Sequence, residues 1–146
     1  MAFRVITLNV NGIRSAAKKG VFRWLAAQRA DVVCLQELKC HEADLDAKLH
    51  GLKAFESCYA FAEKKGYSGV AIYSRHAPDE VKQGFAVREF DSEGRYVEAR
   101  FGKLWVVSLY LPSGSALKDV YVFAVLILVL VFRPAGLFGE QVRTRA

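Results

Sequence analysis

The sequence predicts an α/β protein whose last part has a different character. Runs of β-branched and apolar residues flank one amphipathic helical stretch within the first 35 residues. Further strand-like runs, separated by glycine-containing turns, continue as far as residue 110. An unbroken apolar run then occupies residues 120–132. We therefore divide the chain into a folded domain at 1–115 and an apolar segment with a short basic tail at 116–146.

Two strands are predicted close to the N-terminus. Residues 3–9 (FRVITLN) are β-branched and apolar, and this run breaks at the turn dipeptide Asn11-Gly12. A second buried strand is predicted at 31–35, before the polar pair Gln36-Glu37. A strand, a helix and a strand within about thirty residues predict two neighbouring strands, with the helix crossing one face of their sheet.

The predicted helix between these strands spans residues 15–30. Val21, Trp24 and Leu25 lie at helical spacing among lysines and arginines, which is typical of an amphipathic helix. A second, short helix is predicted at 43–49.

The middle of the chain is rich in strands. We predict a hairpin across Gly102-Lys103, because two strand-like runs meet at this turn dipeptide. A loop at 112–115 (PSGS) closes the domain. The predicted strands are 57–62, 70–74, 81–85, 95–101 and 104–110.

Charge and cysteine content limit the partners and the compartment. The net charge of +6 suits a polyanion such as DNA, although spread-out charge also serves solubility alone. Cys34 lies inside an apolar run, which favours a buried structural thiol. The pair Cys40-His41 has no second pair of ligands to complete a zinc site. The N-terminus lacks the pattern of a secretory signal, so we expect a cytoplasmic location.

Polar residues at the ends of the first two strands are the candidate site. Asn9 and Asn11 flank the end of the first strand, and Glu37 follows the second. Neighbouring strands would place these groups on one rim of the sheet. A carboxylate with amide oxygens suits Mg²⁺ or Mn²⁺ rather than zinc. The alternative is a plain Asn-Gly turn and a solvated glutamate.

Five motifs, in order, resemble those of the exonuclease III / AP endonuclease family, part of the endonuclease/exonuclease/phosphatase superfamily. They are LNVNGIR at 8–14, LQELK at 35–39, GYSGVAIYS at 66–74, DSEGR at 91–95 and YLPSGS at 110–115. The resemblance implies half of a two-sheet α/β sandwich. It also implies Mg²⁺-dependent (or Mn²⁺-dependent) hydrolysis of DNA phosphodiesters beside abasic sites and at 3′ ends.

The same resemblance assigns roles at the strand ends. It makes Glu37 a metal ligand and gives Asn9 a supporting place in the metal site. Asn11 would lie at the edge of the active site. The implied partner is double-stranded DNA with abasic sites or 3′ ends, and no protein partner is predictable.

Three further residues receive roles from the later motifs. Tyr110 would contact the scissile phosphate, with its phenol donating a hydrogen bond to a non-bridging oxygen. Arg95 is either structural or turned toward phosphate. Ser113 is a further candidate for DNA contact.

The chain departs from the family after residue 115. The sequence has neither a Gly-Asp-Phe-Asn element nor a late Ser-Asp-His element, which in the family handle the nucleophilic water and the phosphate. General-base assistance alone is worth about 10²- to 10⁴-fold. We expect little or no turnover, which leaves its status as an enzyme open. We also expect the second sheet to be lost, which would uncover an apolar face and favour aggregation.

The apolar tail has its own likeness. The thirteen residues 120–132 fall short of the twenty or so that span a bilayer. Residues 118–134 and 136–140 resemble the C-terminal end of permease subunits of branched-chain amino acid ABC transporters. A joint near 115–118 between unrelated coding sequences would explain both halves.

Other accounts of the chain stay open. One is a divergent family member with a lipid-facing anchor, associated with the inner membrane through 120–132. A second is a membrane-associated fragment of a transporter permease. A superfamily phosphatase is the nearest enzymatic rival. We expect the apolar segment to be helical, or else to pack on the sheet.

Overall fold

The structure, a computed structural model, describes residues 3–45, 52 and 54–111. The chain divides after Tyr110 into two units, and every helix and strand below lies in the first. In this part of the chain the strands form two sheets, ordered β1-β2-β4-β3 and β5-β6-β7. The predicted α/β class is confirmed, with the strands arranged in two sheets.

The first sheet begins with the predicted pair of neighbouring strands. β1 (Val5–Asn9) runs parallel to β2 (Val32–Gln36). β4 (Val70–Ser74) is antiparallel to β2, and β3 (Glu56–Ala60) is antiparallel to β4. β4 is buried along its whole length and β2 nearly so, as expected of central strands with both faces covered.

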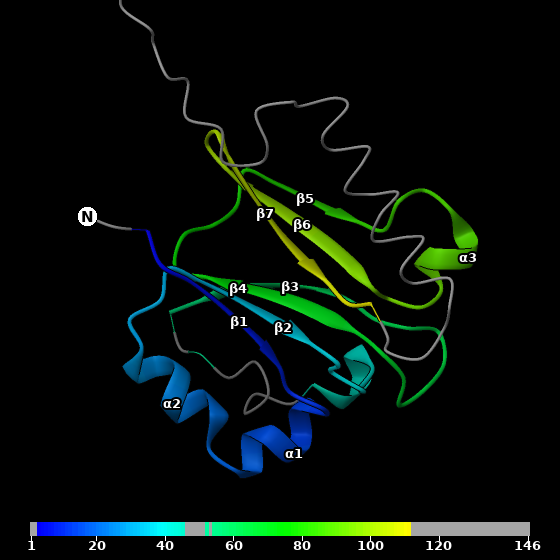
Figure 1. Cartoon of the computed structure of the whole chain (residues 1–146), viewed down its shortest axis with the longest axis horizontal. Helices are drawn as coiled ribbons and strands as arrows, with labels where there is room; N and C mark the ends of the chain where they lie inside the picture. Colours follow the sequence, from blue (N-terminus) through cyan, green and yellow to red (C-terminus); the bar gives the residue numbers. More distant parts are fainter. Residues whose placement is uncertain (1–2, 46–51, 53, 112–146) are drawn as a thin grey trace, which may run out of the picture. The chain divides into compact units, whose positions relative to one another are not determined.

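Two helices, rather than one, connect β1 to β2 and cover one face of this sheet (Figure 1). The prediction of a single helix over 15–30 is wrong. α1 (Ile13–Lys18) and α2 (Val21–Ala27) are separated at Gly20, whose left-handed conformation (φ 88°) ends the first helix. Ile13 and Leu25 are fully buried beneath the sheet.

Two short elements complete the helical part. A 3₁₀ turn, η1 (Glu42–Asp44), begins where the helix over 43–49 was predicted, and residues 46–49 of that prediction lie outside the described residues. α3 (Arg88–Asp91) was not predicted. Its four residues are too few to show a helical period in the sequence.

The second sheet is present, so the prediction that it is lost is wrong. β5 (Glu80–Gln83), β6 (Tyr96–Phe101) and β7 (Leu104–Leu109) pair antiparallel, and β6 and β7 form the predicted hairpin. Each predicted strand lies within two residues of its observed bounds. The strands after residue 80 pair with one another because their alternating apolar residues form one face of a separate sheet.

The core has two layers, one on each face of the first sheet. Between the helices and the sheet lie buried residues that include Val33, Leu35 and Tyr73. Between the two sheets lie Val32, Cys34, Val70, Ile72, Val97, Ala99 and Val106. The predicted buried thiol is confirmed, since Cys34 is 3% exposed and burial raises its pKa to about 12.

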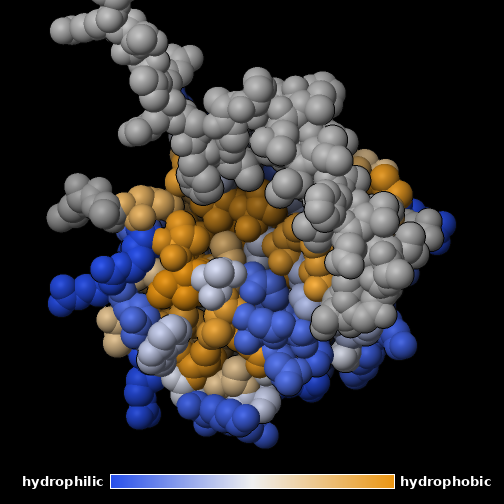
Figure 2. All heavy atoms as spheres, in the orientation of Figure 1, coloured by the Kyte–Doolittle hydropathy of each residue, from blue (hydrophilic) through white to orange (hydrophobic). Residues whose placement is uncertain are grey.

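Apolar side chains nevertheless remain on the surface. Figure 2 shows apolar residues gathered on the visible face of the molecule. Exposed large apolar residues on the two sheets include Val5, Trp105, Val107 and Leu109. Poor solubility thus stays a prediction. Within the described ranges no helix is both long and apolar enough to cross a membrane, and the apolar run at 120–132 lies beyond them.

A matched pair of glycines tests the packing of the second sheet. Gly94 (φ 57°) is buried, and a Cβ there would lie 2.3 Å from the carbonyl carbon of Phe61. Gly102 (φ 60°) has nothing within 4 Å of the same position. Both changes to alanine carry left-handed strain of about 1–2 kcal/mol. Gly94→Ala adds a backbone clash, so we expect it to lower the unfolding free energy by roughly 1–3 kcal/mol more than Gly102→Ala. Urea denaturation measures both, and equal losses would contradict this packing.

Candidate active site

The parallel pairing of β1 with β2 brings two predicted site residues together. Asn9 is the last residue of β1 and pairs in register with Gln36, the last residue of β2. Glu37 directly follows Gln36 and therefore lies beside Asn9 at the carboxyl edge of the sheet. The Asn9 amide nitrogen donates a 2.7 Å hydrogen bond to Oε1 of Glu37.

The chain makes a strained turn directly after β2. Glu37 and Lys39 both have left-handed backbones, with φ of 55° and 51°. Such values are uncommon for residues other than glycine, and they persist only where the surroundings hold them. Gly12 N donates to Glu37 O at 2.7 Å, and Ile13 N donates to Leu38 O at 2.9 Å. The loop after β1 thus fixes one side of the turn.

The loop before β4 fixes the other side. Leu38 N donates to Gly69 O at 3.0 Å, and Lys39 N donates to Ser68 O at 2.8 Å. Leu38 is fully buried, and a Cβ at Gly69 (φ 88°) would lie 3.1 Å from that of Leu38. This close approach requires a glycine at position 69. The turn is therefore anchored at the core while Glu37 and Lys39 reach the surface.

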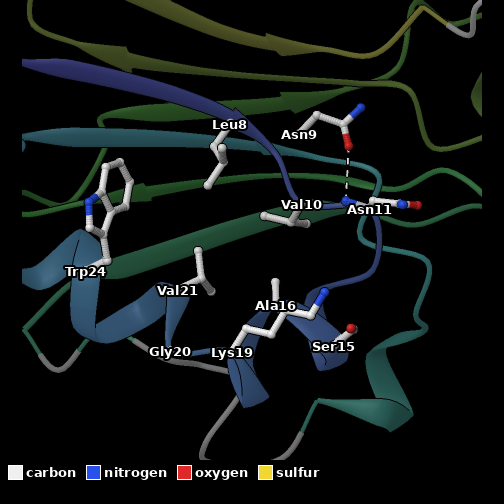
Figure 3. A pocket seen from close by; sticks show the side chains of 10 residues that line it. All are labelled: Leu8, Asn9, Val10, Asn11, Ser15, Ala16, Lys19, Gly20, Val21 and Trp24. Carbon is white, nitrogen blue, oxygen red and sulfur yellow. Dashed lines mark hydrogen bonds between the residues drawn. The ribbon is translucent and has the colours of Figure 1, made fainter.

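Lys39 is the cationic residue that contacts the Glu37 carboxylate. Its Nζ lies 2.9 Å from Oε2 of Glu37 and also donates to Oδ1 of Asn11. Asn11 has a left-handed backbone (φ 45°), and its N–H donates to the Oδ1 of Asn9 at 3.0 Å (Figure 3). Asn9 therefore orients Glu37 with its nitrogen and the turn at Asn11 with its oxygen.

Tyr110 approaches Glu37 from the second sheet. It follows β7, and its N–H donates to the backbone oxygen of Arg95 at 2.9 Å. Its phenol hydrogen-bonds the Glu37 carboxylate. Burial, followed by this bond to Glu37, raises the pKa of Tyr110, so the phenol keeps its proton near neutral pH.

The Arg95 side chain has a contact network of its own. Its guanidinium is 2.7 Å from Glu93, donates to the Tyr67 hydroxyl at 3.0 Å, and has a side chain only 17% exposed. These contacts tie the Arg95 side chain to Glu93 and Tyr67, and the choice between its two predicted roles stays open. Ser113 lies outside the described residues.

The electrostatics favour the charged form of Glu37. Its pKa lies below the ordinary range of a glutamate, because the carboxylate accepts hydrogen bonds from Asn9, Lys39 and Tyr110. The Asn9 bond is the largest of these causes. The group is thus an anion throughout the physiological pH range.

A pocket of about 510 Å³ opens beside this site, between β1 and the two helices (Figure 3). Asn9 and Asn11 line it near the candidate site. Lys19, Val21 and Trp24 belong to the helical side. Figure 3 shows the Asn9 and Asn11 side chains turned away from Val21 and Trp24, and both asparagines are exposed.

The donor groups fit a hard cation. The ammonium of Lys39 already sits between Glu37 Oε2 and Asn11 Oδ1, so two oxygens converge on one positive charge. These are oxygens of the kind that Mg²⁺ prefers. The described ranges contain no cluster of three or more histidine, cysteine, aspartate or glutamate side chains suited to a metal. An ion held here would keep much of its water shell, as Mg²⁺ commonly does.

Sequence reasoning found the two strand ends but missed Lys39 and Tyr67. Lys39 was part of a matched motif without receiving a role. Its approach to Glu37 depends on two left-handed residues that are not glycine, which a sequence pattern does not reveal. Tyr67 supports Arg95 from a loop, and loops carry no periodic signal.

A model of the endonuclease/exonuclease/phosphatase family matches residues 6–127. A DNA repair nuclease of Danio rerio is 35% identical over 114 residues, covering 77% of this chain and 37% of that protein. An exodeoxyribonuclease of Bacillus subtilis is 35% identical over 111 residues, covering 75% of this chain and 43% of that protein. These matches confirm the predicted resemblance over the first part of the chain.

Solved structures give the same relationship. An AP endonuclease from Archaeoglobus fulgidus superposes with a TM-score of 0.69 at 26% identity, covering 92% of this chain and 51% of that one. A 3′ phosphatase from Neisseria, bound to product DNA hairpin, has a TM-score of 0.69 at 28% identity, covering 84% and 48%. The chain thus spans about half the length of these relatives or less. The likeness of residues 118–146 to a transporter permease stays a prediction.

The hydrogen bond from Asn9 gives a testable pH dependence. Because the folded-state pKa of Glu37 is lowered, its stabilising contribution is present above the ordinary pKa of glutamate. That contribution is lost as the pH falls through the lowered value. We expect Asn9→Ala to raise the pKa of Glu37 toward the ordinary value, measured by ¹³C NMR of side-chain carboxyls. The pKa of Glu80, lowered mainly by Lys82, is the internal control and should not move. An unchanged Glu37 titration would rule out this role for Asn9.

Proposed function

This chain belongs to the endonuclease/exonuclease/phosphatase family, and we propose that it is an exonuclease III-like DNA repair nuclease acting on phosphodiester bonds. One observation carries the proposal. A partly buried carboxylate, Glu37, is held in a preorganised position by Asn9 and accepts a hydrogen bond from Tyr110, which follows a strand of the other sheet. Preorganised groups of this kind stabilise charge that develops in a transition state.

Members of this family generally require a divalent metal ion. For this chain we propose Mg²⁺, or Mn²⁺ in its place, held by Glu37 with the amide oxygen of Asn11 beside it. Asn9 would position Glu37 rather than bind the ion, because its oxygen is engaged by Asn11. When bound, the ion would neutralise charge on the phosphate and on the developing oxyanion.

The protonated Tyr110 completes the proposed phosphate site. Its phenol has one proton, which bonds Glu37 in the free protein. We propose that this proton turns from Glu37 to a phosphate oxygen when the ion binds the carboxylate. Arg95 supports Tyr110 through the backbone, since its carbonyl accepts the Tyr110 N–H. The Arg95 guanidinium is engaged by Glu93 and Tyr67, so we propose that it holds these neighbours in place rather than contacting phosphate.

The proposed substrate is double-stranded DNA with abasic sites or 3′ ends. This rests on relatives named as a DNA repair nuclease, an exodeoxyribonuclease and an AP endonuclease. The net charge of +6 is compatible with DNA. The similar 3′ phosphatase bound to DNA makes removal of a 3′ phosphate a second candidate reaction of the same site. We propose a cytoplasmic location for the protein.

Metal binding should depend on Glu37. We expect Mn²⁺ titrated calorimetrically into the purified chain to bind, and Glu37→Gln to weaken that binding at least about 10-fold, because the substitution removes the carboxylate charge. Glu80→Gln is the matched control, since Glu80 pairs with Lys82 and Arg100 on the other sheet. Equal Mn²⁺ affinities of the wild type and Glu37→Gln would contradict the proposed metal site.

Catalytic turnover should be low in this chain alone. The sequence carries neither of the two family elements that handle the attacking water and the phosphate. We therefore expect its Mg²⁺-dependent nicking of an abasic-site duplex to be at least about 10²-fold slower than that of the Bacillus subtilis exodeoxyribonuclease assayed beside it. EDTA and Glu37→Ala should abolish any remaining nicking. Fast, Glu37-dependent cleavage would show that these 146 residues hold a complete catalytic set.

A further inference from the structure

The candidate metal site already contains a positive charge. Oε1 of Glu37 accepts a hydrogen bond from Asn9 at 2.7 Å, and Oε2 lies 2.9 Å from the Lys39 ammonium. The same ammonium donates to Oδ1 of Asn11. The two oxygens that we propose for the metal are therefore those that bind Lys39.

We propose that Lys39 is a resident counter-ion, which binds the oxygens of Glu37 and Asn11 until a divalent ion displaces it. This inference rests on the proposed function, because it concerns the same metal site. It makes Lys39 a competitor of the metal for these two oxygens.

The geometry allows this exchange without refolding. The backbone of the turn is fixed, since Leu38 is fully buried and Lys39 N donates to Ser68 O. The Lys39 side chain, in contrast, is 38% exposed and consists of a flexible four-carbon stem. Glu37 remains oriented by Asn9 after the ammonium leaves. Only one side chain has to move.

Charge then links metal binding to phosphate binding. Without metal, the charges of Glu37 and Lys39 cancel. A bound divalent ion raises the local charge to +2, because the ammonium stays tethered two residues from Glu37. This excess positive charge weakens metal binding in the free protein. A phosphate anion bound nearby would offset the excess charge. Lys39 should therefore weaken metal binding alone and strengthen it when DNA is present, and the effect must be reciprocal.

Calorimetric titration with Mn²⁺ tests the first half of this inference. We expect Lys39→Met to bind Mn²⁺ about 2- to 5-fold more tightly than the wild type, the range that one partly exposed ion pair can account for. Lys39→Arg keeps the positive charge and should stay close to the wild type. Lys82→Met is the matched control, because Lys82 also pairs with carboxylates, Glu80 and Glu98, away from the site.

The same titration in the presence of a short abasic-site duplex tests the second half. The duplex should raise the Mn²⁺ affinity of the wild type by a larger factor than that of Lys39→Met. Equal or weaker Mn²⁺ binding by Lys39→Met in the absence of DNA would overturn the counter-ion role, as it would show that Lys39 only positions Glu37. An equal effect of the duplex on both proteins would overturn the link to phosphate.

Two further measurements keep these outcomes separate. If Glu37→Gln binds Mn²⁺ like the wild type, the proposed metal site itself fails; if Glu37→Gln loses binding while Lys39→Met does not gain it, only the counter-ion proposal fails. Wild-type protein tests the exchange even if a variant does not fold. Its Lys39 ammonium, followed by ¹⁵N NMR, should shift as Mg²⁺ is added, and a Lys39 signal unchanged at saturating Mg²⁺ would contradict displacement.

Discussion

The parallel register of β1 and β2 is the constraint on which the candidate site depends. Pairing of Asn9 with Gln36 places the amide of Asn9 beside the first residue after β2, Glu37. A slip of one residue would turn every side chain of β1 to the opposite face. Leu8 would then leave the helix-covered core, to which it contributes, and the amide would no longer meet the carboxylate. The packing of the sheet and the geometry of the site therefore select the same register.

The second sheet contributes Tyr110, which reaches the Glu37 carboxylate from outside the first sheet. Ser108 of β7 is fully buried and donates to Leu35 O at 3.3 Å, while Gln36 Nε2 donates to Ser108 Oγ at 3.2 Å. These bonds tie β7 to the end of β2. Tyr110 follows two residues later and so arrives at Glu37. Buried polar groups need partners, and here they also fix the relation between the two sheets.

The sequence predicted what depends on periodicity. Alternating apolar residues located the strands, and polar residues after two neighbouring strands predicted that Asn9 and Glu37 would meet. It did not predict the break at Gly20, because a lone glycine within an amphipathic pattern is often tolerated in a helix. The second sheet was missed because strand patterns do not state which strands pair. Lys39 was missed because left-handed turns at non-glycine residues are imposed by tertiary contacts.

A carboxylate held in place to bind a metal, as we propose for Glu37, is energetically unfavourable while no cation is bound to it. Glu37 is held in place by Asn9 and has a side chain only 17% exposed, so it can neither turn fully into water nor relax far. An unpaired, partly desolvated anion is unfavourable. Lys39 relieves this problem locally, since its ammonium can pair with Glu37 while its backbone stays fixed. The same pairing must oppose metal binding, because one pair of oxygens cannot serve both cations fully. Stability of the metal-free turn and affinity for the metal are therefore opposed in this site, and a phosphate anion favours the metal-bound form.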